Sequence, residues 1–119
     1  MVLKAEHKWD NGERHIYSVK FLYGENTSYA EVYRVIAEPD EQDDLIREKF
    51  KYKYQGVQYC AVGVAKRNPI DKINKAKGRT LAFQRAIVDL PEVVVDQLKN
   101  IYYSTHRVSD FIKLGQNKR

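Results

Sequence analysis

The stretch AVGVAKRNPIDKINKAKGRTLAFQRA, residues 61–86, decides the fold, because the spacing of its apolar residues changes along it. Its first part completes a nearly continuous apolar run that starts at residue 56, which is typical of a central strand of a sheet. Asn68 and Pro69 then suit the N-cap and the first position of a helix. We therefore expect a strand to lead into a helix over residues 69–90.

The sequence before this stretch is typical of an antiparallel sheet. The segments RHIYSVKFLYG (14–24) and YAEVYRVIAE (29–38) are rich in β-branched and aromatic residues, and turn sequences bound both. The pair Asn11-Gly12 tolerates the positive φ angles of a tight hairpin. The sequence thus predicts a sheet of about four to five strands over residues 2–66.

Two segments in this first half are highly charged: one alternates lysines with aromatic residues, and the other is a cluster of acids. KFKYKYQ, residues 49–55, places Phe50, Tyr52 and Tyr54 on one side of an extended chain and lysines on the other, so we expect a strand. The acidic segment EPDEQDDLIRE, residues 38–48, is expected to be a solvated loop. Its carboxylates lack the burial that acid/base catalysis requires, and weak cation binding is the most they suggest.

A second helix is predicted after the first. Pro91 can begin it, and we expect it to span residues 91–107, followed by a short turn capped by Ser109 and a polar tail. Its apolar stripe consists of Val94, Leu98, Ile101 and Tyr102. The expected architecture is therefore α+β: one domain over residues 1–119, with an N-terminal antiparallel sheet followed by two C-terminal helices packed on it.

Composition narrows the class of protein. The chain has 119 residues, of which 43% are hydrophobic and 31% charged, and these values fit one globular domain rather than a disordered chain. The net charge of +5 favours an anionic partner. The single cysteine, Cys60, is expected in the core. Since neither a signal peptide nor an apolar run of about 20 residues is evident, we expect a cytoplasmic protein without membrane contact.

The first predicted helix carries an arginine whose surroundings decide its role. Ideal helical geometry places Arg79 on a face that begins basic and ends apolar, and this face is expected to be free for a ligand or a partner chain. That face contains Lys72, Lys75, Arg79, Ala82, Phe83 and Ala86. The expected packing stripe contains Ile70, Ile73, Leu81 and Val88. Gly78 costs about 1 kcal/mol of helix propensity, which indicates a close backbone approach there.

Four residues are candidates for contact with a nucleotide. Arg79 and Arg107 offer guanidinium donors for phosphate, Phe83 offers a ring for stacking on a base, and Asn74 offers polar recognition. Each also has a structural interpretation. Arg79 can pair with Asp89 or the acidic segment, Phe83 can belong to the core, and Arg107 can stabilise a helix C-terminus.

The pattern of residues 61–86, together with a sheet first and two helices last, resembles the phage anti-Thoeris sponges. That resemblance implies a protein of the infected bacterial cytoplasm that binds the TIR-derived signal glycocyclic ADP-ribose, or cyclic oligonucleotides, without cleaving it. It also implies a homodimer or higher homo-oligomer with pockets formed partly by the helices. No catalytic, Walker or zinc-ligand spacing occurs in the sequence, so we expect no enzyme activity, no cofactor and no metal.

The sequence is also compatible with two functions other than nucleotide binding. A small DNA- or RNA-binding protein would use the lysines and rings of residues 49–54, although strict alternation places the two kinds on opposite faces. A protein inhibitor of a host enzyme would use the acidic segment, residues 38–48.

Overall fold

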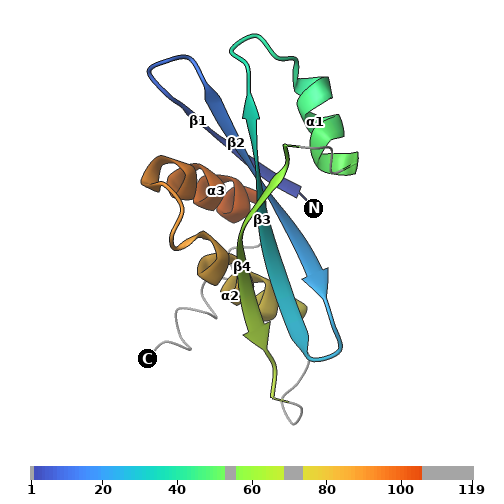
Figure 1. The fold of residues 1–119 in the computed structure, drawn as a ribbon. Coiled ribbons are helices and arrows are strands. Elements are labelled where there is room, and N and C mark those ends of the chain that lie inside the picture. The colour runs from blue at the N-terminus through green and yellow to red at the C-terminus, as the bar shows by residue number, and fades with distance from the viewer. Residues whose placement is uncertain (1, 53–55, 69–73, 106–119) are drawn as a thin grey trace.

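The chain folds into an antiparallel sheet with helices on both of its faces (Figure 1). The computed structural model describes residues 2–52, 56–68 and 74–105. The elements are β1 (Val2–Lys8), β2 (Arg14–Tyr23), β3 (Thr27–Ala37), α1 (Asp43–Tyr52), β4 (Gln58–Lys66), α2 (Lys75–Ile87) and α3 (Glu92–Thr105). The strand order β1-β2-β3-β4 confirms the α+β class and the sheet before the two C-terminal helices.

The first hairpin forms where the sequence predicts it. Gly12 adopts a φ of 86°, and its N–H donates to the carbonyl oxygen of Trp9 at 2.9 Å. Only residues that tolerate positive φ fit this position well. The turn sets the register of β1 against β2, in which His7 lies opposite His15.

Strand β4 lies at an edge of the sheet, so its predicted central position is wrong. Among the described strands, β3 alone pairs with it. Cys60 forms a bulge, because Ala61 pairs with Val32 while Tyr59 pairs with Tyr33. Its apolar run is buried on one face alone: Tyr59 keeps 55% of its surface exposed. Cys60 is half-buried against the core rather than fully inside it, and this burial raises the pKa of its thiol.

Helices α2 and α3 cover one face of the sheet and enclose the main core. Helix α2 packs on β3 and β4, and α3 packs on β1. Gly63 of β4 permits the closest approach, because a Cβ there would lie 1.9 Å from the carbonyl oxygen of Ala82 and 2.5 Å from the nitrogen of Ala86. The predicted stripe of α3 is confirmed, since Val94, Leu98 and Tyr102 are fully buried and Ile101 packs against them.

The face of α2 that packs on the sheet is not the predicted one. Its buried residues are Thr80, Ala82, Phe83, Ala86 and Ile87. Val88, predicted to pack, keeps 70% of its surface exposed, and Leu81 is half-buried. Ala82 and Ala86 have small side chains and lie against Gly63, so this face lets α2 approach β4 closely. Ile70, Lys72 and Ile73 lie outside the described residues.

Helix α2 is also shorter than predicted. Asn74 has an extended backbone (φ −137°, ψ 93°) and caps the helix by accepting from the N–H of Lys77 at 3.0 Å. The predicted cap at Asn68 is therefore wrong. At the other end the helix stops at Ile87, close to the predicted boundary. Residues 106–119, including the predicted turn at Ser109, lie outside the described residues.

Helix α1 replaces both a predicted loop and part of a predicted strand. It begins within the acidic segment, where Asp43 and Asp44 stabilise the positive helix N-terminus. It continues through Lys49–Tyr52, so the predicted strand is wrong for these residues. Ile46 and Phe50, four residues apart, share one helical face and pack on Ile16, which points to the sheet face opposite α2 and α3. Tyr54 lies outside the described residues.

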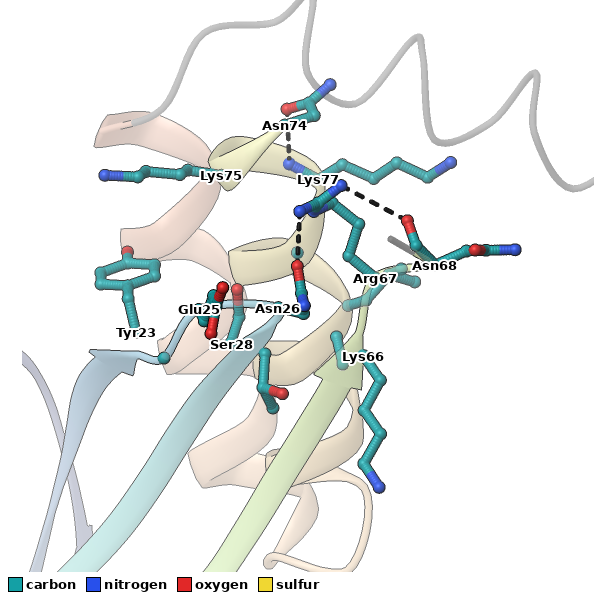
Figure 2. Close-up of a pocket in the computed structure, with 15 residues that line it drawn as sticks. Tyr23, Glu25, Asn26, Ser28, Lys66, Arg67, Asn68, Asn74, Lys75 and Lys77 are labelled. Carbon is teal, nitrogen blue, oxygen red and sulfur yellow. Dashed lines mark hydrogen bonds between the residues drawn. The ribbon is translucent and has the colours of Figure 1, made fainter. Parts of the chain in front are cut away.

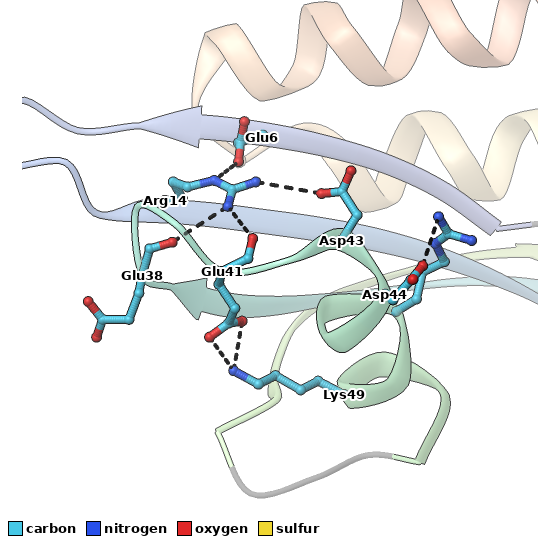
Figure 3. Close-up of polar contacts among 8 residues, drawn as sticks. Glu6, Arg14, Glu38, Glu41, Asp43, Asp44 and Lys49 are labelled. Carbon is cyan, nitrogen blue, oxygen red and sulfur yellow. Dashed lines mark hydrogen bonds and ion pairs between the residues drawn. The ribbon is translucent and has the colours of Figure 1, made fainter.

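One arginine ties this helix to the sheet (Figure 3). Arg14 pairs with Glu6, donates to the carbonyl oxygen of Glu41 at 3.0 Å and lies 3.8 Å from a carboxylate oxygen of Asp43. Lys49 then holds the Glu41 carboxylate at 2.8 Å. The acidic segment is therefore held against the protein by ion pairs.

Candidate functional site

A cavity of about 300 Å³ opens between the end of the sheet and the first turn of α2 (Figure 2). Three segments distant in sequence form its wall: the β2–β3 turn, the end of β4 and the start of α2. Its polar and aromatic lining consists of Tyr23, Glu25, Asn26, Thr27, Ser28, Lys66, Arg67, Asn68, Asn74, Lys75 and Lys77. The remaining lining residues are Gly24, Ala65, Gly78 and Leu81.

The β2–β3 turn and the end of β4 are joined by hydrogen bonds at the cavity floor. The N–H of Arg67 donates to the carbonyl oxygen of Asn26 at 2.7 Å, and the guanidinium of Arg67 donates to the Asn26 side chain. Figure 2 shows Arg67 reaching from β4 toward the first turn of α2. The turn itself is closed by the N–H of Gly24, which donates to the carbonyl oxygen of Thr27 at 2.8 Å.

Close contact between α2 and β3 forms the inner wall. A Cβ on Gly78 would lie 2.6 Å from Oγ of Ser28. The close approach predicted at Gly78 is confirmed, and its partner is the sheet. This contact holds the N-terminal turn of the helix directly above the strand ends.

The cavity has a strongly positive lining. The lining includes four basic residues, Lys66, Arg67, Lys75 and Lys77, and a single acidic one, Glu25. The positive end of the α2 dipole adds to this charge because the cavity contains the first residues of the helix. Ammonium and guanidinium groups together with a helix N-terminus form an arrangement suited to phosphate or another anion.

Of the three predicted site residues that the structure describes, Asn74 alone lines this cavity. Its side-chain oxygen is engaged as the α2 N-cap. Phe83 is fully buried and stacked on Tyr102, with ring centres 4.3 Å apart and planes 11° apart. Its ring therefore has no exposed surface on which a base could stack in this structure, and its role in base stacking stays a prediction. Arg107 lies outside the described residues.

Arg79 does not line the cavity, and it is bonded to a buried tyrosine. Its Nε donates to the Tyr102 hydroxyl at 3.1 Å. Burial alone would lower the pKa of Arg79, but its interactions with Tyr102 and Tyr23 outweigh burial and raise the pKa above its ordinary value. The predicted free Arg79 face is thus wrong, since this guanidinium is half-buried and bonded within the protein.

The Tyr102 hydroxyl is the centre of this buried network. Thr80 donates its hydroxyl proton to the carbonyl oxygen of Ala76 at 2.9 Å, and Thr80 Oγ1 lies 2.6 Å from the Tyr102 hydroxyl. The Tyr102 hydroxyl accepts from Arg79, and either hydroxyl can be the donor in its contact with Thr80. Burial raises the pKa of Tyr102, although the bonds from Thr80 and Arg79 act in the opposite direction.

The sequence predictions missed most of the cavity, above all Tyr23, Asn26 and Arg67. The available signal was the polar turn GENTS after β2 and the triplet Lys66-Arg67-Asn68 after β4. In an antiparallel sheet the end of β4 lies beside the start of β3, so these loops had to meet once the pairing was known.

The cavity offers charge and hydrogen-bond donors rather than a set of reactive groups. Its described lining contains neither a histidine nor a cysteine. Over residues 2–52, 56–68 and 74–105, no three His, Cys, Asp or Glu side chains come together as a metal-ligand set. The basic side chains of the described lining offer an anion charge-assisted hydrogen bonds.

The chain matches no protein-family model, no curated protein and no solved structure. None of the helices in the described part of the chain is both long and apolar enough to cross a membrane.

Proposed function

We propose that this protein binds and sequesters a phosphate-bearing nucleotide signal without cleaving it. The observation that carries the proposal is the cavity beside the α2 N-terminus, with its four basic side chains against one acid. A sponge acts by lowering the concentration of free ligand, so tight binding is sufficient and no reactive group is required.

The size of the cavity supports a compact ligand. Its volume of about 300 Å³ is at the lower end of the range for small-molecule sites, and strands and a helix enclose it. A nucleotide of limited length fits such a site better than a long polymer, which needs an extended basic track.

The alternative surfaces have less support. Lys49, expected to meet nucleic acid, is paired with Glu41, and residues 49–52 belong to a helix. Within the acidic segment, Glu41 and Asp43 are engaged by Lys49 and Arg14, which leaves fewer free charges to attract a host enzyme.

The resemblance of residues 61–86 to the anti-Thoeris sponges suggests the ligand class. Under this proposal the chain is a phage anti-defence protein that captures glycocyclic ADP-ribose or a cyclic oligonucleotide in the cytoplasm of its host. A homo-oligomer would complete the enclosure of the ligand. Neither catalysis nor a cofactor takes part in this mechanism.

Calorimetric titration with glycocyclic ADP-ribose, cyclic di- and trinucleotides, ADP and pyrophosphate tests the proposal. We expect submicromolar binding of at least one nucleotide, and chromatography of the released ligand should recover it intact. Absence of heat with every one of these compounds would refute the proposal, and recovery of a cleaved product would refute sequestration without chemistry.

Charge-reversal variants locate the site. The double variant Lys75→Glu and Lys77→Glu should weaken binding at least about 100-fold, because two charge-assisted contacts are lost. Acidic residues also suit the first turn of a helix, so the fold should persist. The matched control is Lys8→Glu with Lys99→Glu, two exposed lysines outside the cavity. Equal loss in both double variants would indicate attraction by net charge alone.

Salt dependence separates a small ligand from nucleic acid. Binding of a polymer releases many counterions and weakens steeply with salt, whereas a ligand with few phosphates shows a shallow slope. A steep slope with single-stranded or duplex DNA, at an affinity above that for every small nucleotide, would favour the DNA- or RNA-binding alternative.

A further inference from the structure

Tyr23 is the one aromatic residue among the described residues that line the cavity. It is the last residue of β2, and 47% of its surface is exposed. Lys75 extends from the first turn of α2 above this ring, with its ammonium 6.0 Å from the ring centre (Figure 2). A planar apolar surface and a positive charge therefore stand next to each other at the cavity wall.

The position of Tyr23 is set by the sheet. It is the last residue of β2 and pairs with Ser28 of β3, and the turn that follows it is closed by the N–H of Gly24, which donates to the carbonyl oxygen of Thr27 at 2.8 Å.

We propose that Tyr23 is the surface on which the planar ring of the ligand stacks. This inference rests on the proposed function and narrows its ligand class. The ligand combines an aromatic base with phosphate, and sugar phosphates or inorganic anions fill only the charged part of the site.

The charge beside Tyr23 suits a nucleotide. The Lys75 ammonium lies beside the ring, so a phosphate carried by the stacked nucleoside meets a positive charge without moving away from Tyr23.

Comparison of ADP with pyrophosphate isolates the ring contact. Both carry a diphosphate, and ADP alone carries a base. In calorimetry at one pH and salt concentration, the unaltered protein should bind ADP more tightly than pyrophosphate. Tyr23→Leu should weaken ADP binding about 10-fold and leave pyrophosphate binding within about twofold, since base–aromatic stacking is of this size. Tyr23→Phe, which keeps the ring, should retain most of the ADP preference.

The outcomes separate this inference from the proposed function. If the unaltered protein binds pyrophosphate and ADP equally well, or Tyr23→Leu leaves their ratio unchanged, the stacking role of Tyr23 is overturned while anion capture stands. If neither these probes nor the nucleotide panel binds, the proposed function and this inference fail together.

Discussion

Gly63 of β4 lies directly against Ala82 of α2: a Cβ on Gly63 would be 1.9 Å from the Ala82 carbonyl oxygen. Backbone atoms cannot rotate away from such a contact as a flexible side chain can. Gly63→Ala must therefore displace the whole helix, and we expect the free energy of unfolding to fall by about 3 kcal/mol or more. Urea unfolding followed by circular dichroism measures this loss.

Gly24→Ala is the matched control for this substitution. A Cβ on Gly24 would meet its nearest neighbour, the carbonyl oxygen of Thr27, at 3.7 Å, an ordinary contact distance. Gly24→Ala should change the free energy of unfolding by less than about 0.5 kcal/mol. A Gly63→Ala protein as stable as the Gly24→Ala protein would show that α2 does not pack as closely as the structure has it.

The strands and the last helix were predictable because their patterns have one physical interpretation. Period-two alternation flanked by turn residues, as around Gly12, leaves little choice but a hairpin, and the stripe that ends in Tyr102 fits a helix alone. Residues 49–52 were ambiguous. Their alternation suggested a strand, but Ile46 and Phe50 also fit one helical face, and tertiary contact with Ile16 decided the outcome.

The candidate site was less predictable because it depends on pairing and on helix rotation. Asn26 and Arg67 are 41 residues apart and meet only through the register of β3 and β4. The rotation of α2 depends on Gly63, whose missing side chain gives no periodic signal. The sequence pattern predicted a different face of α2 against the sheet, so Arg79 and Phe83 were both expected in the site. In the structure both contact Tyr102.

Arg14 is expected to stabilise the protein by holding the segment before α1. Its side chain is 15% exposed and reaches Glu6, Asp43 and the carbonyl oxygen of Glu41 (Figure 3). Arg14→Met removes these partners while keeping the aliphatic stem, and should lower the free energy of unfolding by about 2 kcal/mol. It should also accelerate proteolysis between β3 and α1, as limited digestion with mass spectrometry would detect.

Arg47→Met is the control for the loss of one positive charge. Arg47 and its partner Asp44 expose 65% and 91% of their side chains, so their pair should contribute less than about 0.5 kcal/mol. If Arg14→Met and Arg47→Met lower the free energy of unfolding equally, the partners of Arg14 together stabilise the protein no more than one surface ion pair does.

Substitutions of Phe83 distinguish a role in the core from a role in ligand binding. Phe83→Leu keeps an apolar side chain of adequate volume and should lower the free energy of unfolding by about 1–2 kcal/mol, whereas Phe83→Ala should cost about 3–5 kcal/mol. Since the ring is fully buried, the folded leucine variant should bind ADP and pyrophosphate within twofold of the unaltered protein. A folded Phe83→Leu protein that selectively lost ADP binding would restore Phe83 to the site.

The ionisation of Tyr102 should make stability fall at alkaline pH. Burial disfavours the phenolate and raises the folded-state pKa above the ordinary value of 10.0, although the hydrogen bonds with Thr80 and Arg79 partly oppose this. Above about pH 10 the unfolded chain therefore loses this proton while the folded protein keeps it, so the stabilisation present at lower pH is lost as pH rises. Urea unfolding at a series of pH values, compared between the unaltered protein and Tyr102→Phe, isolates this contribution from that of the other tyrosines.

At neutral pH, Tyr102→Phe should cost about 1–2 kcal/mol, because Thr80 and Arg79 each lose a buried partner. Phenylalanine cannot ionise, so the variant should lack this component of the alkaline loss. The stability difference between the two proteins should therefore shrink as pH rises above about 10. A difference that stays constant from neutral to strongly alkaline pH would mean that Tyr102 ionises as readily in the folded protein as in the unfolded chain, contrary to its burial against Thr80 and Phe83 of α2.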